Sequence, residues 1–160
     1  MTEHVASSPG GAVPRRRVPR VIPLLNPIAR FLLARGVSLG PNALITVRGR
    51  NSGLPRTTPV AIIDVDGRRW IWSPWGDVHW VRNLRAAGRA TIAVGGRTEQ
   101  VRAAELEPEQ RVAFFRDTLT PVADRMPFGR TFVRVVDGVD LGDPLEAAEG
   151  RVVFELLPIG

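Results

Sequence analysis

The sequence contains no cysteine, no lysine and no tyrosine among its 160 residues. The absence of cysteine excludes disulfide scaffolds, thiolate metal sites and cysteine nucleophiles. Without lysine there is no Schiff-base or lysine-base chemistry, and without tyrosine one common proton donor is missing. His4 and His79 are the only histidines, so a multi-histidine metal centre is not expected and no metal site is predicted. A Ser/His/Asp triad would have to use one of these two side chains, so the sequence does not favour hydrolase chemistry.

Long hydrophobic runs are also scarce. The apolar stretch from Val21 to Ala29 is far short of the roughly 20 residues that a transmembrane helix needs. Prolines and arginines interrupt the sequence after residues 15–17, and no small-residue cleavage site follows, so the pattern does not match an export signal. We therefore expect a cytoplasmic protein without a transmembrane span.

The composition is that of one globular domain, with 44% hydrophobic and 24% charged residues. The net charge is +6, and all 22 basic residues are arginine. Residues 1–20 combine Ser, Pro and Gly with arginines and have almost no bulky apolar side chains, which is typical of segments that stay unfolded. We predict a mobile basic arm over residues 1–20 and a single domain over residues 21–160.

Residues 15–35 join clustered arginines to an apolar segment. Asn26 and Pro27 are typical of a helix start and Gly36 of its end, with Ile28 and Phe31 on one face. Such a helix suits either packing on its own domain or peripheral contact with an anionic membrane, at the inner face of the plasma membrane. No nucleic-acid contact is predicted, because the arm lacks aromatic residues for base stacking.

From Ala43 onward the pattern indicates strands joined by tight turns. β-Branched and apolar residues predict strands over residues 43–49, 57–65, 68–73, 90–94, 97–106 and 151–157. Asp66-Gly67 and Gly95-Gly96 are typical of the two-residue turns of β-hairpins. The sequence therefore predicts six strands that include two hairpins.

Helices interrupt these strands at irregular intervals. We predict one helix over residues 77–88, capped by Asp77 and ended by Gly88, and another that begins at Pro108. Residues 137–150 are rich in Gly, Asp and Pro and predict a loop. This order favours a mainly β (α+β) fold, a split antiparallel β-barrel with flanking helices, over a parallel doubly wound sheet.

The segment from Arg48 to Pro59 is the strongest candidate for a binding site. It joins two predicted strands through a loop that contains two glycines, Ser52 and three arginines. Backbone amides near the glycines, the Ser52 hydroxyl and the guanidinium groups can all donate hydrogen bonds. Several such donors at one place suit a phosphate group. A solvated hairpin loop in an arginine-rich protein would have the same composition, and the residues alone leave both interpretations open.

All four tryptophans lie within eleven residues, between Trp70 and Trp80. Trp70 and Trp72 alternate along a predicted strand, so we expect them in the core. Trp75 and Trp80 flank a short loop and suit the walls of a pocket for a planar ring. His79 lies at the predicted helix start, where a lone histidine is more often structural than catalytic.

Three motifs together resemble the deazaflavin-dependent nitroreductase family of actinobacteria. They are GRNSGLPRTTPV, then SPWGDVHWVRNLRAAG, then ATIAVGGRTEQVRA, and they match the family's GRxSGxxRxxPL loop, W-x-x-NL segment and V-x-VGGR hairpin. The resemblance covers roughly residues 23–119. It implies a split β-barrel of the flavin-binding type that uses the reduced deazaflavin coenzyme F420.

The resemblance also implies roles for individual residues. Arg50, Asn51, Ser52, Gly53 and Arg56 would hold the phosphate and acidic tail of the cofactor. Thr57 and Pro59 would lie along its ribityl chain, and Ser73, Trp75 and Trp80 would border its ring. The family usually has lysine where Asn51 stands, and its nitro-reducing members have pocket tyrosines that this chain lacks.

We therefore predict an F420-dependent oxidoreductase, similar to nitroreductases and quinone reductases. It would transfer a hydride to a small or lipophilic electron-poor acceptor, which would be a quinone, an enone or a nitro compound. Water, Ser73 or His79 would supply the proton. The alternatives are a split barrel that binds FMN or haem, with FMN as the second choice of cofactor, and a non-enzymatic protein that binds membrane surfaces.

Overall fold

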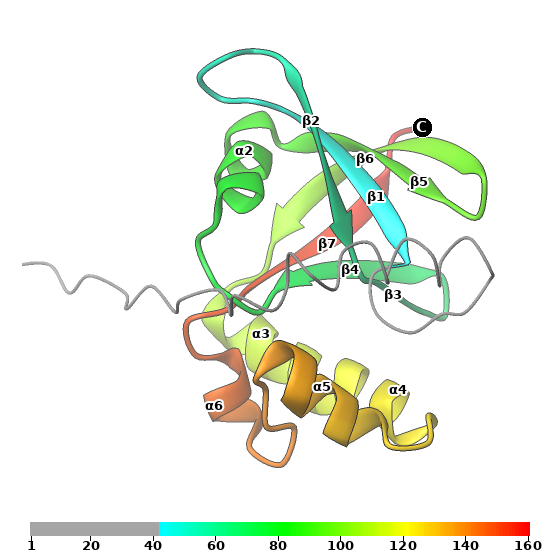
Figure 1. Ribbon diagram of the computed structural model, residues 1–160, viewed down its shortest axis with the longest axis vertical. Coiled ribbons are helices and arrows are strands. Elements are labelled where there is room, and N and C mark those ends of the chain that lie inside the picture. The colour runs from blue at the N-terminus through cyan, green and yellow to red at the C-terminus, as the bar shows by residue number, and fades with distance from the viewer. Residues whose placement is uncertain (1–41) are drawn as a thin grey trace, which may run out of the picture.

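The computed structural model describes residues 42–160 and shows a curled antiparallel sheet with helices on both sides (Figure 1). The strand order is β2-β1-β5-β6-β7-β4-β3. The strands are β1 Ala43–Arg48, β2 Pro55–Val60, β3 Ile62–Val65, β4 Arg68–Ser73, β5 Arg89–Val94, β6 Arg97–Glu105 and β7 Val152–Pro158. The curled sheet forms a half-barrel, which confirms the predicted mainly β fold of the split-barrel type. The basic arm, the helix near Asn26 and the membrane contact of residues 15–35 lie outside the described residues.

Two hairpins have the turns that the sequence predicts. Asp66 and Gly67 both have positive φ angles, 53° and 79°, and so do Gly95 and Gly96, with 55° and 76°. Positive φ at both central residues is the geometry of a type I′ turn, whose twist matches that of the flanking strands. These turns connect β3 to β4 and β5 to β6 in antiparallel register.

The prediction of one strand over residues 57–65 is wrong, because the chain turns a corner at Ala61. β2 pairs with β1, whereas β3 pairs with β4 at the other end of the strand order. The side-chain amide of Asn42 stabilises the corner: it donates to the Ile62 carbonyl at 3.0 Å and accepts from the Ile62 amide at 2.8 Å. The corner joins the two edges of the sheet and raises the number of strands from six to seven.

Helix α2, His79–Ala87, fills the concave side of the sheet. Its buried residues Val81 and Leu84 pack among the inward-facing side chains of the strands. The core on this side consists of Ala43, Ile45, Val47, Val60, Ile62, Ile71, Val81, Leu84, Ala90, Ile92, Val101, Val152, Phe154 and Leu156. We call this side of the sheet the inner face and the opposite side the outer face.

The two ends of α2 differ in how well the sequence predicts them. Gly88 ends the helix in the left-handed conformation, as expected. Asp77 is not the cap, because Val78 occupies the N-cap position and no side chain caps the helix there. The Asp77 carboxylate instead pairs with Arg82 and Arg85, each at 2.9 Å. Desolvation would raise the pKa of Asp77, but its hydrogen bonds to the two guanidinium groups lower it.

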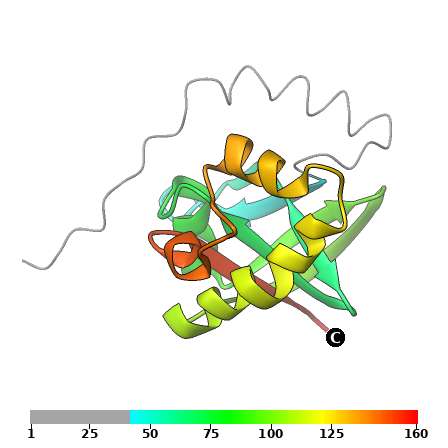
Figure 2. The ribbon, with the colours of Figure 1, turned by 90° about the horizontal axis from the view of Figure 1, so that it is seen from below.

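A second helical layer covers the outer face of β3, β4 and β7 (Figure 2). Its elements are α3 Pro108–Ala113, the π-helical turn η1 Phe114–Leu119, α4 Thr120–Asp124, α5 Gly129–Asp137 and α6 Pro144–Ala148. The rings of Phe114 and Phe115 lie 6.0 Å from Trp70 and 5.5 Å from Trp72, respectively. This contact confirms the expected core role of the two strand tryptophans. No helix within residues 42–160 is long and apolar enough to span a bilayer.

The predicted loop over residues 137–150 contains a short helix. Asp143 caps α6 with its carboxylate, which accepts from the amides of Leu145 and Glu146, and Pro144 takes the first helical position. Asp followed by Pro is a helix-start pattern, so the signal was present in the sequence. The segment was nevertheless predicted as a loop, because it is rich in Gly and Asp and the helix has only five residues.

Arg151 connects this layer to β7. Its side chain is 1% exposed and donates to the carbonyl of Gly138 and to carbonyls at the end of α6. Nearby Asp137 ends α5, and burial raises the pKa of its carboxyl to about 7 despite the attraction of Arg151. The buried Arg151 guanidinium thus joins the ends of α5 and α6, and it lies outside the candidate site described below.

Candidate cofactor site

The loop between β1 and β2 is closed by its own backbone. The amide of Gly49 donates to the Leu54 carbonyl at 2.8 Å, and the amide of Gly53 donates to the Gly49 carbonyl at 2.8 Å. Gly53 has a φ angle of +69°, which favours glycine. A Cβ atom on Gly49 would lie 2.7 Å from the Ser52 hydroxyl. The backbone of the loop therefore requires glycine at position 53, and a side chain at Gly49 would displace the Ser52 hydroxyl.

Asn83 of α2 holds this loop against the helix. Its side-chain oxygen accepts from the backbone amide of Arg50 at 3.2 Å and from the Arg50 guanidinium at 2.8 Å. Asn83 is 8% exposed, so its amide is protected from competing water. The W-x-x-NL segment by itself predicts no role for Asn83. A buried polar residue on an otherwise apolar helix face was the signal that could have found it.

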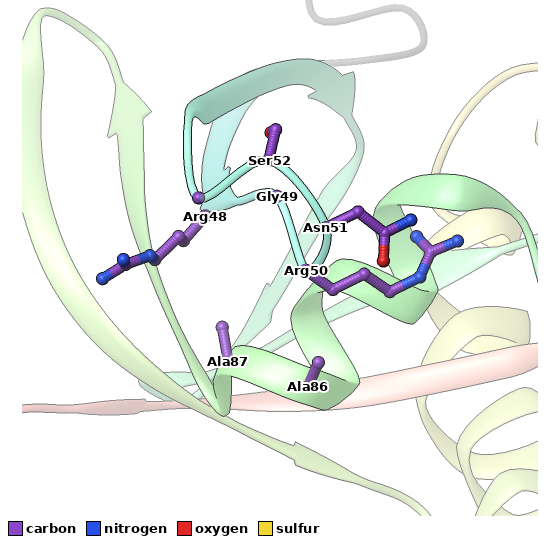
Figure 3. Close-up of a pocket in the computed structure, with 8 residues that line it drawn as sticks. Arg48, Gly49, Arg50, Asn51, Ser52, Ala86 and Ala87 are labelled. Atoms are coloured by element: carbon purple, nitrogen blue, oxygen red, sulfur yellow. The ribbon is translucent and has the colours of Figure 1, made fainter.

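The loop and the end of α2 enclose a pocket of about 470 Å³ (Figure 3). It is lined by residues 48–53 together with Ala86 and Ala87. Figure 3 shows that the Arg48 side chain points to one side of the loop, whereas Arg50 and Asn51 point to the other. The predicted loop residues Arg50, Asn51, Ser52 and Gly53 therefore meet at one pocket.

Positive charge at this loop has no carboxylate partner among the described residues. Arg48 and Arg56 form no ion pair there, and Arg50 bonds to a neutral amide. Elsewhere in residues 42–160 several arginines pair with acids, such as Arg69 with Glu99 at 2.8 Å. A rigid loop with uncompensated guanidinium groups suits an anionic ligand such as a phosphate.

The other predicted residues of β2 lie on two faces of the sheet. Arg56 is level with Val47, whose side chain is in the inner core. Thr57 is level with Thr46, and their hydroxyls lie 2.8 Å apart. Because neighbouring residues of a strand point to opposite faces, Arg56 extends from the inner face and Thr57 from the outer face.

The outer face of β2, β1, β5 and β6 changes from polar to apolar away from the loop. One row of side chains is hydroxyl- and amide-bearing: Thr57, Thr46, Thr91 and Gln100. The next row, farther from the loop, is mostly apolar: Pro59, Leu44, Ala93 and Thr98. Leu44 is 40% exposed, so no described residue covers this row completely.

The structure does not bring Ser73, Trp75, His79 and Trp80 to the loop pocket. Ser73 is 1% exposed, and its hydroxyl donates to the Gly76 carbonyl at 2.9 Å. Trp80 packs on the inner core, with its ring 6.4 Å from that of Phe154. His79 is exposed at the first residue of α2, and Trp75 is half-buried. A direct contact between these side chains and a cofactor is still a prediction.

Comparison with known families identifies this combination of loop and half-barrel. The model of the F420H(2)-dependent quinone reductase family matches residues 33–127, which is more than half of the chain. The chain belongs to the F420H(2)-dependent quinone reductase family. This protein is therefore an oxidoreductase that depends on coenzyme F420, as the sequence motifs predicted. A search of curated proteins gave no match.

Solved structures are similar to this chain at low sequence identity. A conserved hypothetical protein from Mycobacterium tuberculosis is 18% identical, with a TM-score of 0.51, over 80% of this chain and 79% of that chain. An F420-H2 dependent reductase, FDR-A, is 19% identical, with a TM-score of 0.48, over 72% of this chain and 93% of that one. An FAD-binding protein from Mesorhizobium loti is 16% identical, with a TM-score of 0.49, over 81% of this chain and 89% of that chain.

The residues on the outer face and in the loop fit the parts of F420. The loop arginines, which form no ion pair among the described residues, suit an anionic phosphate. The polar row of Thr57, Thr46, Thr91 and Gln100 offers hydrogen bonds to a hydroxyl-bearing chain. The apolar row provides a surface for a planar ring. The loop, the polar row and the apolar row follow one another in the order in which F420 would carry its phosphate, ribityl chain and ring.

Proposed function

We propose that this family member transfers a hydride from reduced F420 to a lipophilic quinone. The description of the matched family supports a quinone acceptor over an enone or a nitro compound. The observation that carries the proposal is the apolar row around Leu44, at the end of the outer face away from the loop. A lipophilic acceptor at this exposed row would lie beside the cofactor ring, and apolar contact would hold it in position.

Arg50, Asn51, Ser52, Gly53 and Arg56 bind the phosphate in this proposal, and Thr57 and Pro59 lie along the ribityl chain. Reduced F420 supplies a hydride from a ring carbon, so positioning contributes more to the rate than acid–base chemistry does. The quinone gains two electrons and a proton with the hydride, and a second proton completes the hydroquinone. Water or His79 supplies that proton in this proposal, because the Ser73 hydroxyl is buried and already donates to Gly76. Exposed His79 is the candidate side-chain donor.

Single-turnover measurements test the choice of acceptor. Protein loaded with reduced F420 is mixed without oxygen with a quinone, an enone or a nitroimidazole, and the return of the oxidised cofactor is followed by absorbance. We expect the quinone to react at least about tenfold faster than the other two, which corresponds to about 1.4 kcal/mol of transition-state stabilisation. Faster reduction of the nitroimidazole or the enone would overturn the choice of a quinone.

A pair of matched variants tests the position of the acceptor. Leu44→Asn is expected to lower kcat/KM for the quinone about tenfold, because it places an amide in the apolar row. Val94→Asn is the control, since Val94 is 38% exposed but belongs to the other face of neighbouring β5. Equal loss in both variants would show that Leu44 does not contact the acceptor.

A further inference from the structure

The three most exposed large hydrophobic side chains of residues 42–160 lie in the outer helical layer. Phe128 is 85% exposed, Val135 78% and Leu145 71%. Phe128, half-buried Phe132 and Val135 follow one another at intervals of four and three residues, which is the spacing of one helix face. Val133 is turned into the core instead. We call Phe128, Phe132 and Val135 the α5 face.

The turn before α5 is tightly packed although Phe128 is exposed. Phe128 has a φ angle of +58°, which is uncommon for an aromatic residue. The next residue, Gly129, lies so close to α4 that a Cβ on it would overlap the Ala123 carbonyl. Large apolar side chains that a well-packed surface leaves exposed together are typical of an interaction site. The α5 face is therefore a candidate docking surface.

The chain from the α5 face to the end of α6 is acidic. Residues 131–150 contain five acidic residues and a single arginine, in a protein whose net charge is +6. Four of the acidic side chains are exposed and form no ion pair within residues 42–160: Asp140, Asp143, Glu146 and Glu149. An anionic membrane would be repelled by these carboxylates, whereas a basic partner would be attracted. This part of the layer therefore suits a partner that is both apolar and basic.

The chain itself contains a segment of this composition. Large apolar side chains are concentrated in residues 21–33: Val21, Ile22, Leu24, Leu25, Ile28, Phe31, Leu32 and Leu33. Arginines directly precede them at positions 15, 16, 17 and 20. We call residues 15–33 the N-terminal segment.

The described chain begins within reach of α5. Asn42 is bonded to Ile62 at the corner before β3, and Ile63 of β3 packs against the same core cluster as Val133 of α5. Residues 34–41 connect the N-terminal segment to Asn42 and, when extended, span up to about 27 Å. Helix α5 is only about 14 Å long. The connection is therefore long enough for the N-terminal segment to lie along α5.

We propose that the N-terminal segment docks on the α5 face of its own chain. The apolar side chains of residues 21–33 cover the α5 face, and the arginines of residues 15–20 pair with the exposed carboxylates that follow it. Of the two roles that the sequence allows for residues 15–35, this proposal selects packing on the same domain over membrane contact. It does not depend on the assignment of the loop as the cofactor site.

Hydrogen exchange of the full chain, followed by mass spectrometry, tests the docking. Amides of residues 21–33 are expected to exchange at least about tenfold more slowly in the wild type than in Phe128→Ser/Val135→Ser, because the variant loses the apolar contact. Both substituted side chains are exposed, so the variant should fold, which protection of its strands would verify. Leu54→Ser is the matched control, since Leu54 is 59% exposed on the β1–β2 loop, and it should leave the protection of residues 21–33 unchanged.

A second variant tests the charge contact. Glu146→Gln/Glu149→Gln removes two exposed carboxylates that form no ion pair with the described residues. It is expected to speed exchange in the N-terminal segment severalfold at low salt, and this difference should vanish at high salt. The same exchange rate as in the wild type at low salt would overturn the pairing of the arginines with these carboxylates.

Three other results would overturn the proposal. Residues 21–33 that exchange as fast as an unfolded peptide in the wild type would show that the N-terminal segment does not dock. Protection that rises with protein concentration, together with a dimer in sedimentation, would assign the α5 face to a second copy of the chain. Protection that appears only with vesicles of anionic phospholipid would assign the N-terminal segment to a membrane surface.

Discussion

Arg56→Ala is expected to weaken F420 binding about thirtyfold, or about 2 kcal/mol, which is the typical size of a lost charge-assisted hydrogen bond. The Arg56 guanidinium forms no ion pair with the described residues, so its charge is available to a ligand. Its strand begins directly after the loop that Gly49 and Gly53 close. Fluorescence titration of the oxidised cofactor measures the change.

Two further variants control this prediction. Arg97→Ala removes the same charge at the distant β5–β6 hairpin and should leave the dissociation constant unchanged. Asn51→Lys should tighten binding, because it adds a cation at a pocket position where the resembled family has lysine. Unchanged affinity in both Arg56→Ala and Asn51→Lys would remove the loop from the cofactor site.

Asn83→Leu is expected to weaken F420 binding about tenfold, although Asn83 is not among the residues proposed to contact the cofactor. Its side-chain oxygen holds both the backbone amide and the guanidinium of Arg50. Leucine has a similar size but cannot accept these hydrogen bonds, so the loop loses its attachment to α2. Removing a buried acceptor also lowers the free energy of unfolding, by about 1–2 kcal/mol.

A double-mutant cycle separates this positioning role from a general loss of stability. If Asn83 acts through Arg50, then Arg50→Ala and Asn83→Leu together should weaken binding little more than Arg50→Ala alone. Affinity is measured well below the melting temperature of each variant, so that all are folded. Effects that simply add would contradict the role of Asn83 as the residue that positions Arg50.

The parts of the fold that the sequence predicted well depend on local chemistry. Asp66-Gly67 and Gly95-Gly96 adopt positive φ angles that few other residue pairs adopt. These two pairs were therefore enough to predict the hairpins. The loop was predictable for a similar reason, because Gly53 occupies a left-handed position. Its proposed role as a cofactor site came from the motif resemblance, since the residues alone left a solvated loop equally possible.

The features that the sequence missed depend on contacts between distant segments. The corner at Ala61 is set by hydrogen bonds between Asn42 and Ile62, twenty positions apart, and nothing within residues 57–65 marks it. The polar row of Thr57, Thr46, Thr91 and Gln100 emerges only when the register of four strands is known, because its members lie far apart in the chain. The W-x-x-NL segment gave no indication that Asn83 binds the loop.

We expect the pocket beside the β1–β2 loop to bind F420 in preference to a flavin. A titration of the full chain with oxidised F420 and with FMN, each at low and at high salt, measures this preference. F420 should bind more tightly than FMN, with an affinity that falls as salt screens the arginines of the loop. Tighter binding of FMN, together with an F420 affinity that does not change with salt, would contradict it.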